Sequence, residues 1–176
     1  MTHAGAPSAV ARVIEEAGLP YAIIGGHAVN AWLEPRFTAD VDITVVADGM
    51  GLAALDAAFR GAGYSLTREY GAELPSGPDF VRWVSVEGDV AEVQLAKTDF
   101  QREVVRRALP TESGARVASP EDLIVLKLIA DRAKDRIDLQ GLAALPDIDW
   151  AYVEGWAREW DVLDRLERLR GRSPSL

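Results

Sequence analysis

One segment, YAIIGGHAVNAWLEPRFTADVDITVV at residues 21–46, constrains the fold more than any other part of the chain. An apolar stretch runs into Gly25 and Gly26, and a second apolar stretch begins with Asp40 and Asp42. Because successive side chains of a strand alternate between its faces, the two aspartates point to one side and the intervening aliphatic residues point into a core. The segment therefore predicts a strand at 21–24, a short helix at about 26–33 and a second strand at 40–46.

The aspartate pair predicts a metal site. Two carboxylates on one face of a strand repel each other, and the pair is costly unless a positive charge lies between them. Strands also disfavour aspartate, so two solvated acids on an exposed face are the weaker interpretation of Asp40 and Asp42. Hard oxygen ligands suit Mg²⁺, and we expect these two residues to bind it.

The two glycines predict a phosphate site beside that metal. Without Cβ atoms, Gly25 and Gly26 let backbone N–H groups approach a phosphate, and the helix they open has a positive N-terminal end. Glycine also serves strand-to-helix turns for geometry alone, so the pair is informative only together with the aspartates. Arg36 could meet a phosphate or pair with Glu34, and Thr38 could donate to a phosphate. A phosphate cradle beside metal-binding carboxylates is typical of phosphoryl or nucleotidyl transfer.

Three later residues are candidates for the same site. Glu92 lies in the middle of a predicted strand, where a charge needs a reason. Lys127 lies in a helix that is apolar on nearly all sides, so it is predicted to be buried against an anion, which a nucleoside triphosphate or a structural salt bridge could supply. Asp135 belongs to the run RAKDRID at 132–138, where it or Asp138 could orient Lys127 or touch substrate. Ordinary charge pairing on a helix surface predicts a similar run.

Taken together, these residues resemble the DNA polymerase beta-like nucleotidyltransferase superfamily, whose signature is a Gly-Gly or Gly-Ser pair, a short helix and Asp-x-Asp on a strand. Within it, the chain looks most like the AbiEii-type nucleotidyltransferases and their small stand-alone bacterial relatives, over roughly residues 10–145. The segment from Gly25 to Asp42 is fairly specific for this superfamily, and the later residues are weaker signals when taken alone. The residues that carry the resemblance are Gly25, Gly26, Arg36, Thr38, Asp40, Asp42, Glu92, Lys127, Lys134, Asp135 and Asp138.

The resemblance implies a Mg²⁺-dependent enzyme that transfers a nucleoside monophosphate from an NTP to a hydroxyl group and releases pyrophosphate. Two metal ions would be bound by Asp40, Asp42 and a third carboxylate, with the phosphates over the glycines and near Arg36 and Lys127. Members of the superfamily usually carry aspartate as the third carboxylate. The candidates here are Asp89, in a predicted turn, and Glu92, which we prefer. Glutamate is one methylene longer, which puts its reach to the metal or to the attacking hydroxyl in doubt.

The acceptor is open at this stage. The resemblance allows the 3′ end of tRNA, a protein side chain, or a small molecule such as an aminoglycoside or lincosamide antibiotic. The departure at Glu92 motivates a second hypothesis, a catalytically weak nucleotide-binding partner protein of a toxin–antitoxin-like pair. A metal-dependent phosphohydrolase is a third hypothesis, disfavoured because the usual His-Asp ligand sets are missing.

We expect an α/β (α+β) fold, a nucleotidyltransferase-like small mixed β-sheet packed against helices, with a helical C-terminal part. Residues 1–118 are predicted to form the catalytic core and 119–176 the helical part packed on it, together one compact unit. Beyond the first segment, strands are predicted at 80–86, 90–95 and 116–118, and helices at about 8–18, 52–61, 98–108, 119–134, 135–145 and 149–169.

Composition narrows the class of protein. The 176 residues include no cysteine, which excludes disulfides, thiolate zinc sites and cysteine nucleophiles. A net charge of −9 disfavours broad nonspecific binding to nucleic acid, although a local basic patch remains compatible with it. The chain lacks a long apolar run and a secretory signal, so we expect a cytoplasmic protein that does not cross a membrane. The five tryptophans are expected in the core or at an interface, with Trp83 the one that could stack a base.

Overall fold

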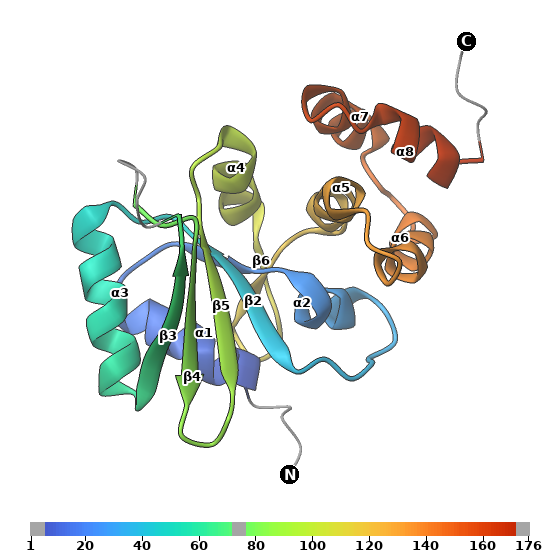
Figure 1. The fold of residues 1–176 in the computed structure, drawn as a ribbon. Helices are drawn as coiled ribbons and strands as arrows, with labels where there is room; N and C mark the ends of the chain where they lie inside the picture. The colour runs from blue at the N-terminus through green and yellow to red at the C-terminus, as the bar shows by residue number, and fades with distance from the viewer. Residues whose placement is uncertain (1–5, 72–76, 172–176) are drawn as a thin grey trace.

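The structure, a computed structural model, describes residues 6–71 and 77–171, and it is built around one seven-stranded mixed sheet (Figure 1). The strand order is β3-β4-β5-β2-β1-β7-β6. The strands are β1 (Tyr21–Ile23), β2 (Asp40–Val45), β3 (Tyr64–Tyr70), β4 (Phe80–Ser85), β5 (Val90–Leu95), β6 (Leu109–Pro110) and β7 (Arg116–Val117). The helices are α1 (Ala6–Glu16), α2 (Gly25–Trp32), α3 (Gly49–Gly61), α4 (Asp99–Arg107), α5 (Pro120–Ala130), α6 (Asp135–Ala143), α7 (Trp150–Glu159) and α8 (Leu163–Leu169). This architecture confirms the expected fold class.

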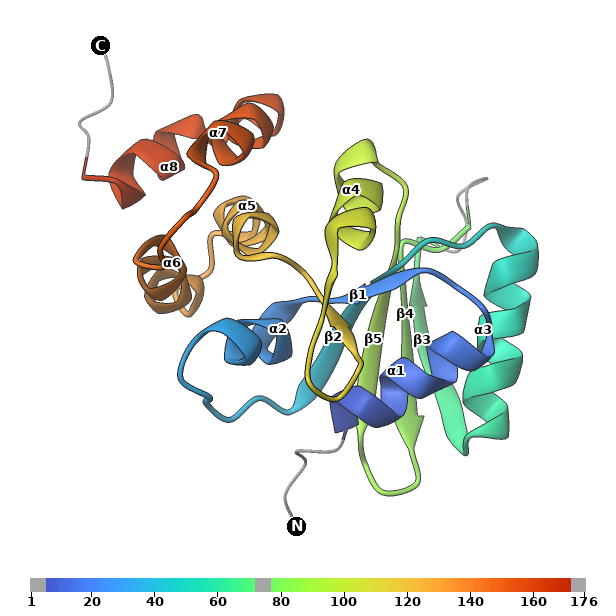
Figure 2. The same ribbon diagram turned by 180° about the vertical axis from the view of Figure 1, so that it is seen from behind.

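The two faces of the sheet differ. Figure 2 shows α1 and α3 lying across one face, whereas Figure 1 looks onto the other face of β3, β4 and β5, where no helix of the described residues lies in front. Helices α5 to α8 gather beyond β1 and α2. The helix-covered face is therefore the core, and the opposite face of these three strands is left accessible.

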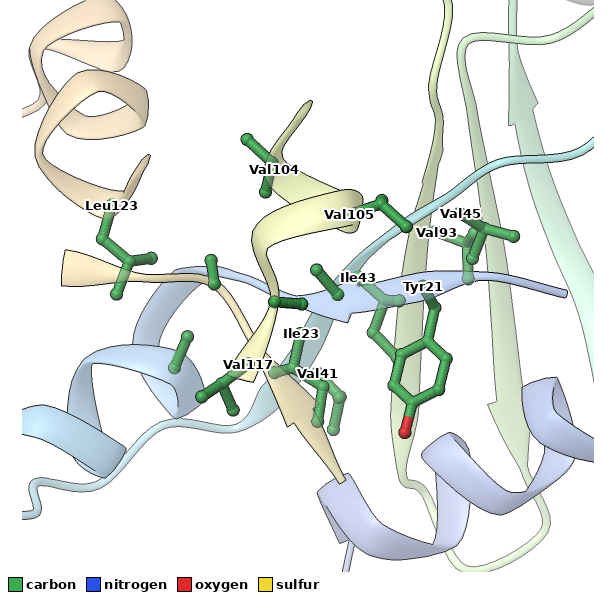
Figure 3. Packing of buried hydrophobic residues seen from close by; sticks show 14 of the residues in the cluster. Tyr21, Ile23, Val41, Ile43, Val45, Val93, Val104, Val105, Val117 and Leu123 are labelled. Atoms are coloured by element: carbon green, nitrogen blue, oxygen red, sulfur yellow. The ribbon is translucent and has the colours of Figure 1, made fainter. Parts of the chain in front are cut away.

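The core forms where the alternation of β2 predicted it. Val41, Ile43 and Val45 are fully buried, and they pack with residues of β1, β5 and α4 (Figure 3). Strand β2 runs antiparallel to β1 and parallel to β5. Each aspartate of β2 consequently faces away from this core and next to a residue of β5.

Two helix starts follow from local sequence signals. Ser119 caps α5 by accepting a hydrogen bond from the backbone N–H of Asp122 at 3.2 Å, with Pro120 in the first turn. Thr98 and Gln101 form the predicted capping box at the start of α4. These signals are short-range, so the sequence reveals them directly.

Several predicted boundaries were wrong. Strand β3 was missed because most of its residues are polar and it is an exposed edge strand, with little apolar alternation. The helix predicted through residue 134 ends at Ala130, because Asp131 adopts a left-handed conformation with φ of 46°. The single stretch predicted at 149–169 is two helices, separated near Asp161, whose φ is 55°.

Trp83 cannot stack a nucleotide base, contrary to expectation. It is fully buried, lies parallel to Phe59 with ring centroids 4.4 Å apart, and donates its indole N–H to Asp56 at 3.4 Å. Alternation along β4 places it on the core face. The other four tryptophans are partly buried, and all four pack on the core.

A buried polar cluster attaches the C-terminal helices to the rest of the fold. The carboxylate of Asp122 on α5 accepts hydrogen bonds from the hydroxyls of Tyr152 on α7, at 2.6 Å, and Ser119, at 2.8 Å. The guanidinium of Arg107 on α4 lies 4.1 Å from the centre of the Tyr152 ring. The cluster thus joins three helices across a long stretch of sequence. Within residues 6–71 and 77–171, no helix combines the length and apolar character that spanning a bilayer requires.

Candidate functional site

The structure brings all of the predicted site residues together. They line one cavity of about 350 Å³, between the start of α2, strands β2 and β5, and the junction of α5 with α6. The predicted residues in its lining are Gly25, Gly26, Arg36, Thr38, Asp40, Asp42, Glu92, Lys127 and Asp135. Phe37, Ala39, Arg132 and Lys134 complete it.

Carboxylates crowd one side of the cavity. Asp42 on β2 is paired in register with Glu92 on β5, so the two side chains project from adjacent strands. Burial, the largest cause, and the negative charges of Glu92 and Asp40 together raise the pKa of Asp42 to about 6, against the opposing effect of Arg132 and Lys134. Both burial and like charge therefore disfavour the ionised form of Asp42.

Glycine is required at positions 25 and 26 because neighbouring side chains lie very close to the backbone there. Gly25 has φ of +63°, and a Cβ at this residue would lie 2.0 Å from Oδ2 of Asp42. A Cβ on Gly26 would lie 2.7 Å from Oγ1 of Thr38. Within the described residues no side chain caps the first turn of α2, so its N–H groups remain available to an anion. The side chains of Thr38 and Asp42 thus lie directly against the backbone at the start of α2.

A Gly25→Ala substitution is expected to destabilise the fold by about 1–3 kcal/mol and to displace the Asp42 carboxylate, since the new methyl group would overlap it. Gly155→Ala is the matched control, because Gly155 is exposed in the interior of α7 and a Cβ there meets nothing within 4 Å. The control should stabilise the protein by about 1 kcal/mol. Urea denaturation of both variants measures the difference, and equal stabilities would contradict the assigned close contact.

Buried ion pairs lie where α5 and α6 border the cavity. Lys127 is buried and donates to Asp135 at 3.1 Å and to Asp138 at 2.6 Å. Burial alone would raise the pKa of both aspartates, but hydrogen bonds outweigh it and hold each pKa below its ordinary value. Those bonds come from Arg132 and Lys127 to Asp135, and from Arg36 and Lys127 to Asp138. The anion predicted to accompany Lys127 is thus supplied within the chain, as the salt-bridge alternative required.

Arg36 is held at the cavity by two sets of contacts. Its guanidinium donates to both oxygens of Asp138, at 3.2 and 2.7 Å, so its partner is not Glu34. Its backbone N–H donates to Asn30 and its carbonyl accepts from the same side chain, at 3.1 and 2.7 Å. The loop after α2 is thereby tied to both α2 and α6.

Sequence reasoning missed two residues of this region. Arg82 on β4 forms an ion pair of 2.9 Å with Glu92, and Phe37 lines the cavity although its side chain is largely exposed. The predicted hairpin indicated that a residue of the strand at 80–86 lies beside Glu92. It did not indicate that this residue is Arg82, because a different turn length would place Val84 opposite Glu92.

Comparison with known proteins supports the fold. No protein-family model matches the sequence, and a search of curated proteins found no match. Among solved structures, the solution structure of the antibiotic-resistance factor ANT(2'')-Ia superposes with a TM-score of 0.61 and 18% identity, covering 93% of this chain and 92% of that one.

Two further structures are similar. ANT(2'')-Ia in complex with adenylyl-2''-tobramycin has a TM-score of 0.50 at 19% identity, covering 92% of this chain and 94% of that one. The lincosamide antibiotic adenylyltransferase LnuA, with lincomycin bound, has a TM-score of 0.56 at 14% identity, covering 76% of this chain and 91% of that one. The chain therefore has a nucleotidyltransferase-like α/β fold.

Proposed function

We propose that this protein is a nucleotidyltransferase that moves a nucleoside monophosphate from an NTP to an acceptor hydroxyl and releases pyrophosphate. The observation that carries the proposal is the shared cavity. This cavity is lined by the residues that the sequence predicted to bind phosphate or metal, although they come from separate stretches of the chain. Its acidic residues include Asp40, Asp42 and Glu92, and its cationic residues include Arg36 and Lys127. Such a site suits a substrate that combines a polyphosphate with divalent metal.

The phosphates are assigned to the glycine side of the cavity. The N-terminal N–H groups of α2 and the hydroxyl of Thr38 can donate to phosphate oxygens, and the missing Cβ atoms let the side chains of Thr38 and Asp42 lie against the start of this helix. Arg132 and Lys134 bring positive charge to the same cavity, and Arg36 and Lys127 are held in place by Asp138. Arg132 and Lys134, which are exposed, bind and orient the triphosphate, and this fixes the α-phosphorus near the carboxylates.

The carboxylates fit Mg²⁺ by their chemistry. Three oxygen-bearing acids lie on adjacent strands, and the pKa of Asp42 is raised by burial first and then by the charges of Glu92 and Asp40, both of which a divalent ion would offset. The described residues contain no ready-made cluster of three such side chains with metal-binding geometry, and Glu92 is held by Arg82. Asp40 and Asp42 would hold the metal, with Glu92 able to join. When bound, two such ions would stabilise charge on the entering and leaving oxygens.

The protein's own groups account for the other parts of the reaction. Glu92 lies beside Asp42, is held there by Arg82, and is the carboxylate that we assign to receive the proton of the acceptor hydroxyl. As that oxygen bonds to the α-phosphorus, the bond from this phosphorus to the bridging oxygen breaks and pyrophosphate leaves. The cationic side chains that line the cavity stabilise the negative charge that develops on the leaving group.

The structural neighbours indicate acceptors to include in a test. One is described in complex with adenylyl-2''-tobramycin and another with lincomycin bound. For this chain we keep three acceptor classes, the 3′ end of tRNA, a protein side chain and a small molecule. The closer kinship with AbiEii-type enzymes is a proposal that rests on the run at 132–138, whose charges contact Lys127 and Arg36.

A second candidate is a nucleotide-binding partner in a toxin–antitoxin-like pair with weak catalysis. The ion pair between Arg82 and Glu92 favours it, because it engages the third carboxylate of the site. This candidate predicts nucleotide binding without transfer.

An α-³²P-NTP transfer assay tests the proposal. Each nucleotide is incubated with Mg²⁺ and separate pools of tRNA, protein extract, and the antibiotics tobramycin and lincomycin, with the Asp42→Ala variant as control. Label that enters one pool and is absent with the variant would support the proposal and identify the acceptor. Mg-NTP binding without label in any pool would favour the binding-partner candidate. Transfer by the variant at the wild-type rate would contradict the assigned site.

A further inference from the structure

A row of polar side chains continues from the carboxylates across the accessible face of the sheet. Asp42 is paired with Glu92, Glu92 with Arg82, and Arg82 with Arg68, on β2, β5, β4 and β3 respectively. Val41, Val93 and Trp83, which are their neighbours along the strands, are buried in the core, so these residues lie on the other face of the sheet. Helices α1 and α3 cover the core face (Figures 1 and 2). The row leads away from the phosphate-binding end of the site, on the far side of Glu92.

A second cavity lies along this row. Its volume is about 430 Å³, and it shares Glu92 with the first cavity. The residues that line it are Tyr70, Asp79, Phe80, Val81, Arg82 and Glu92. Since Glu92 lies between the two cavities, a molecule in the second one is positioned to present a group to the carboxylates.

Two aromatic rings border this second cavity. Tyr70 and Phe80 are directly paired across β3 and β4, and their side chains are 45% and 42% exposed. Trp83, on the same strand as Phe80, is fully buried against Phe59. The guanidinium of Arg68 lies over the Tyr70 ring, 5.4 Å from its centre. Phe80 and the other face of Tyr70 can therefore stack with a planar ligand, which the buried tryptophan cannot do.

The charges beside the rings favour an anionic or neutral ligand. Arg68 lies directly opposite Arg82 in register, and like charges so placed repel each other. Arg68 donates to the hydroxyl of Tyr70 at 2.7 Å. The acids of the cavity are already paired, Asp79 with Lys97 at 2.7 Å and Glu92 with Arg82 at 2.9 Å. A polycation would meet two guanidinium groups here, whereas a phosphate would reduce their repulsion.

We infer that Arg68, Tyr70, Phe80 and Arg82, here named the acceptor platform, bind a nucleotide whose ribose hydroxyl is the acceptor. This inference rests on the proposed function. The base stacks on the rings, and its phosphate meets the arginines. The ribose oxygen attacks the α-phosphorus of the NTP, its proton passes to Glu92 or to water, and pyrophosphate leaves. A free mononucleotide and the end of a single strand share this chemistry.

The test compares acceptors with the wild-type protein and the Tyr70→Ala/Phe80→Ala double variant. The acceptors are 5′-AMP, the ribotrinucleotide of three adenosines, and tobramycin, with α-³²P-ATP and Mg²⁺. The variant should raise the KM for the nucleotide acceptor by tenfold or more and leave the KM for ATP unchanged. Leu109→Ala is the control, because Leu109 is 44% exposed on β6 at the opposite edge of the sheet and should alter neither value. Whichever of 5′-AMP and the trinucleotide has the lower KM shows whether the acceptor is a free mononucleotide or the end of a single strand.

Calorimetric titration of the trinucleotide into each protein separates this inference from the proposed function. Binding that the double variant loses, without transfer to any acceptor, would support the platform and overturn the proposed function. Transfer to tobramycin and to neither nucleotide acceptor, unchanged in the double variant, would overturn the platform and support the proposed function. Equal trinucleotide binding by the wild type and the variant would also overturn the platform.

Discussion

Asp42→Asn is expected to lower the rate of the proposed nucleotidyl transfer by about 10³-fold, because losing the carboxylate proposed to bind metal would cost several kcal/mol of transition-state stabilisation. The asparagine keeps the size of the side chain and its place beside Glu92 on the neighbouring strand. The fold should therefore remain intact, which the circular dichroism spectrum would confirm. The measurement is the initial rate of label transfer at saturating NTP.

The same variant is expected to be more stable than the wild type without metal. The folded-state pKa of Asp42 is about 6, against an ordinary value of 3.8, so the folded protein holds this proton more tightly than the unfolded chain. The stabilisation that the bound proton provides is present below about pH 4 and is lost as the pH rises through about 6. Removing the charge should therefore stabilise the protein above pH 6 by up to about 3 kcal/mol and change little near pH 4.

Urea denaturation in EDTA at both pH values checks this expectation. Glu87→Gln is the matched control, since it also removes one negative charge, but from an exposed turn between β4 and β5. It should change the free energy of unfolding by less than about 0.5 kcal/mol. If Asp42→Asn destabilised the metal-free protein at neutral pH, the cost assigned to burying the ionised Asp42 among other acids would be wrong.

Lys127→Met is expected to give the largest loss of stability, about 3 kcal/mol or more. Methionine fills a similar volume but leaves Asp135 and Asp138, both buried, without their shared cation. Arg132 and Arg36 would still contact one aspartate each, so the fold should survive in a weakened form. Thermal and urea denaturation measure the loss.

Lys134→Met is the control for that substitution. Lys134 lines the same cavity, but its residue is exposed, so losing its charge should cost less than about 0.5 kcal/mol. Equal stabilities of the two variants would show that the contacts of Lys127 add nothing to the fold. A Lys127→Met variant that retained wild-type stability but lost NTP binding would assign the lysine to the substrate alone.

The sequence by itself determined the parts of the site that depend on short-range geometry. Asp40 and Asp42 share a face because strand side chains alternate, and Gly25 lies at a strand-to-helix junction because the apolar pattern changes there. The caps at Thr98 and Ser119 were predictable for the same reason. Strand β3 was not, since an exposed edge strand carries little apolar alternation.

Only the tertiary structure decided which distant residues meet. Glu92 lies beside Asp42 because β2 and β5 pair in parallel, and the parallel register is not encoded in either strand alone. Arg36 contacts Asp138 across 102 positions of sequence, and the α5–α6 junction places two carboxylates on Lys127. Arg82 likewise reaches Glu92 only through the observed hairpin register. Local patterns fix the conformation of each segment, whereas such partners depend on how the segments pack together.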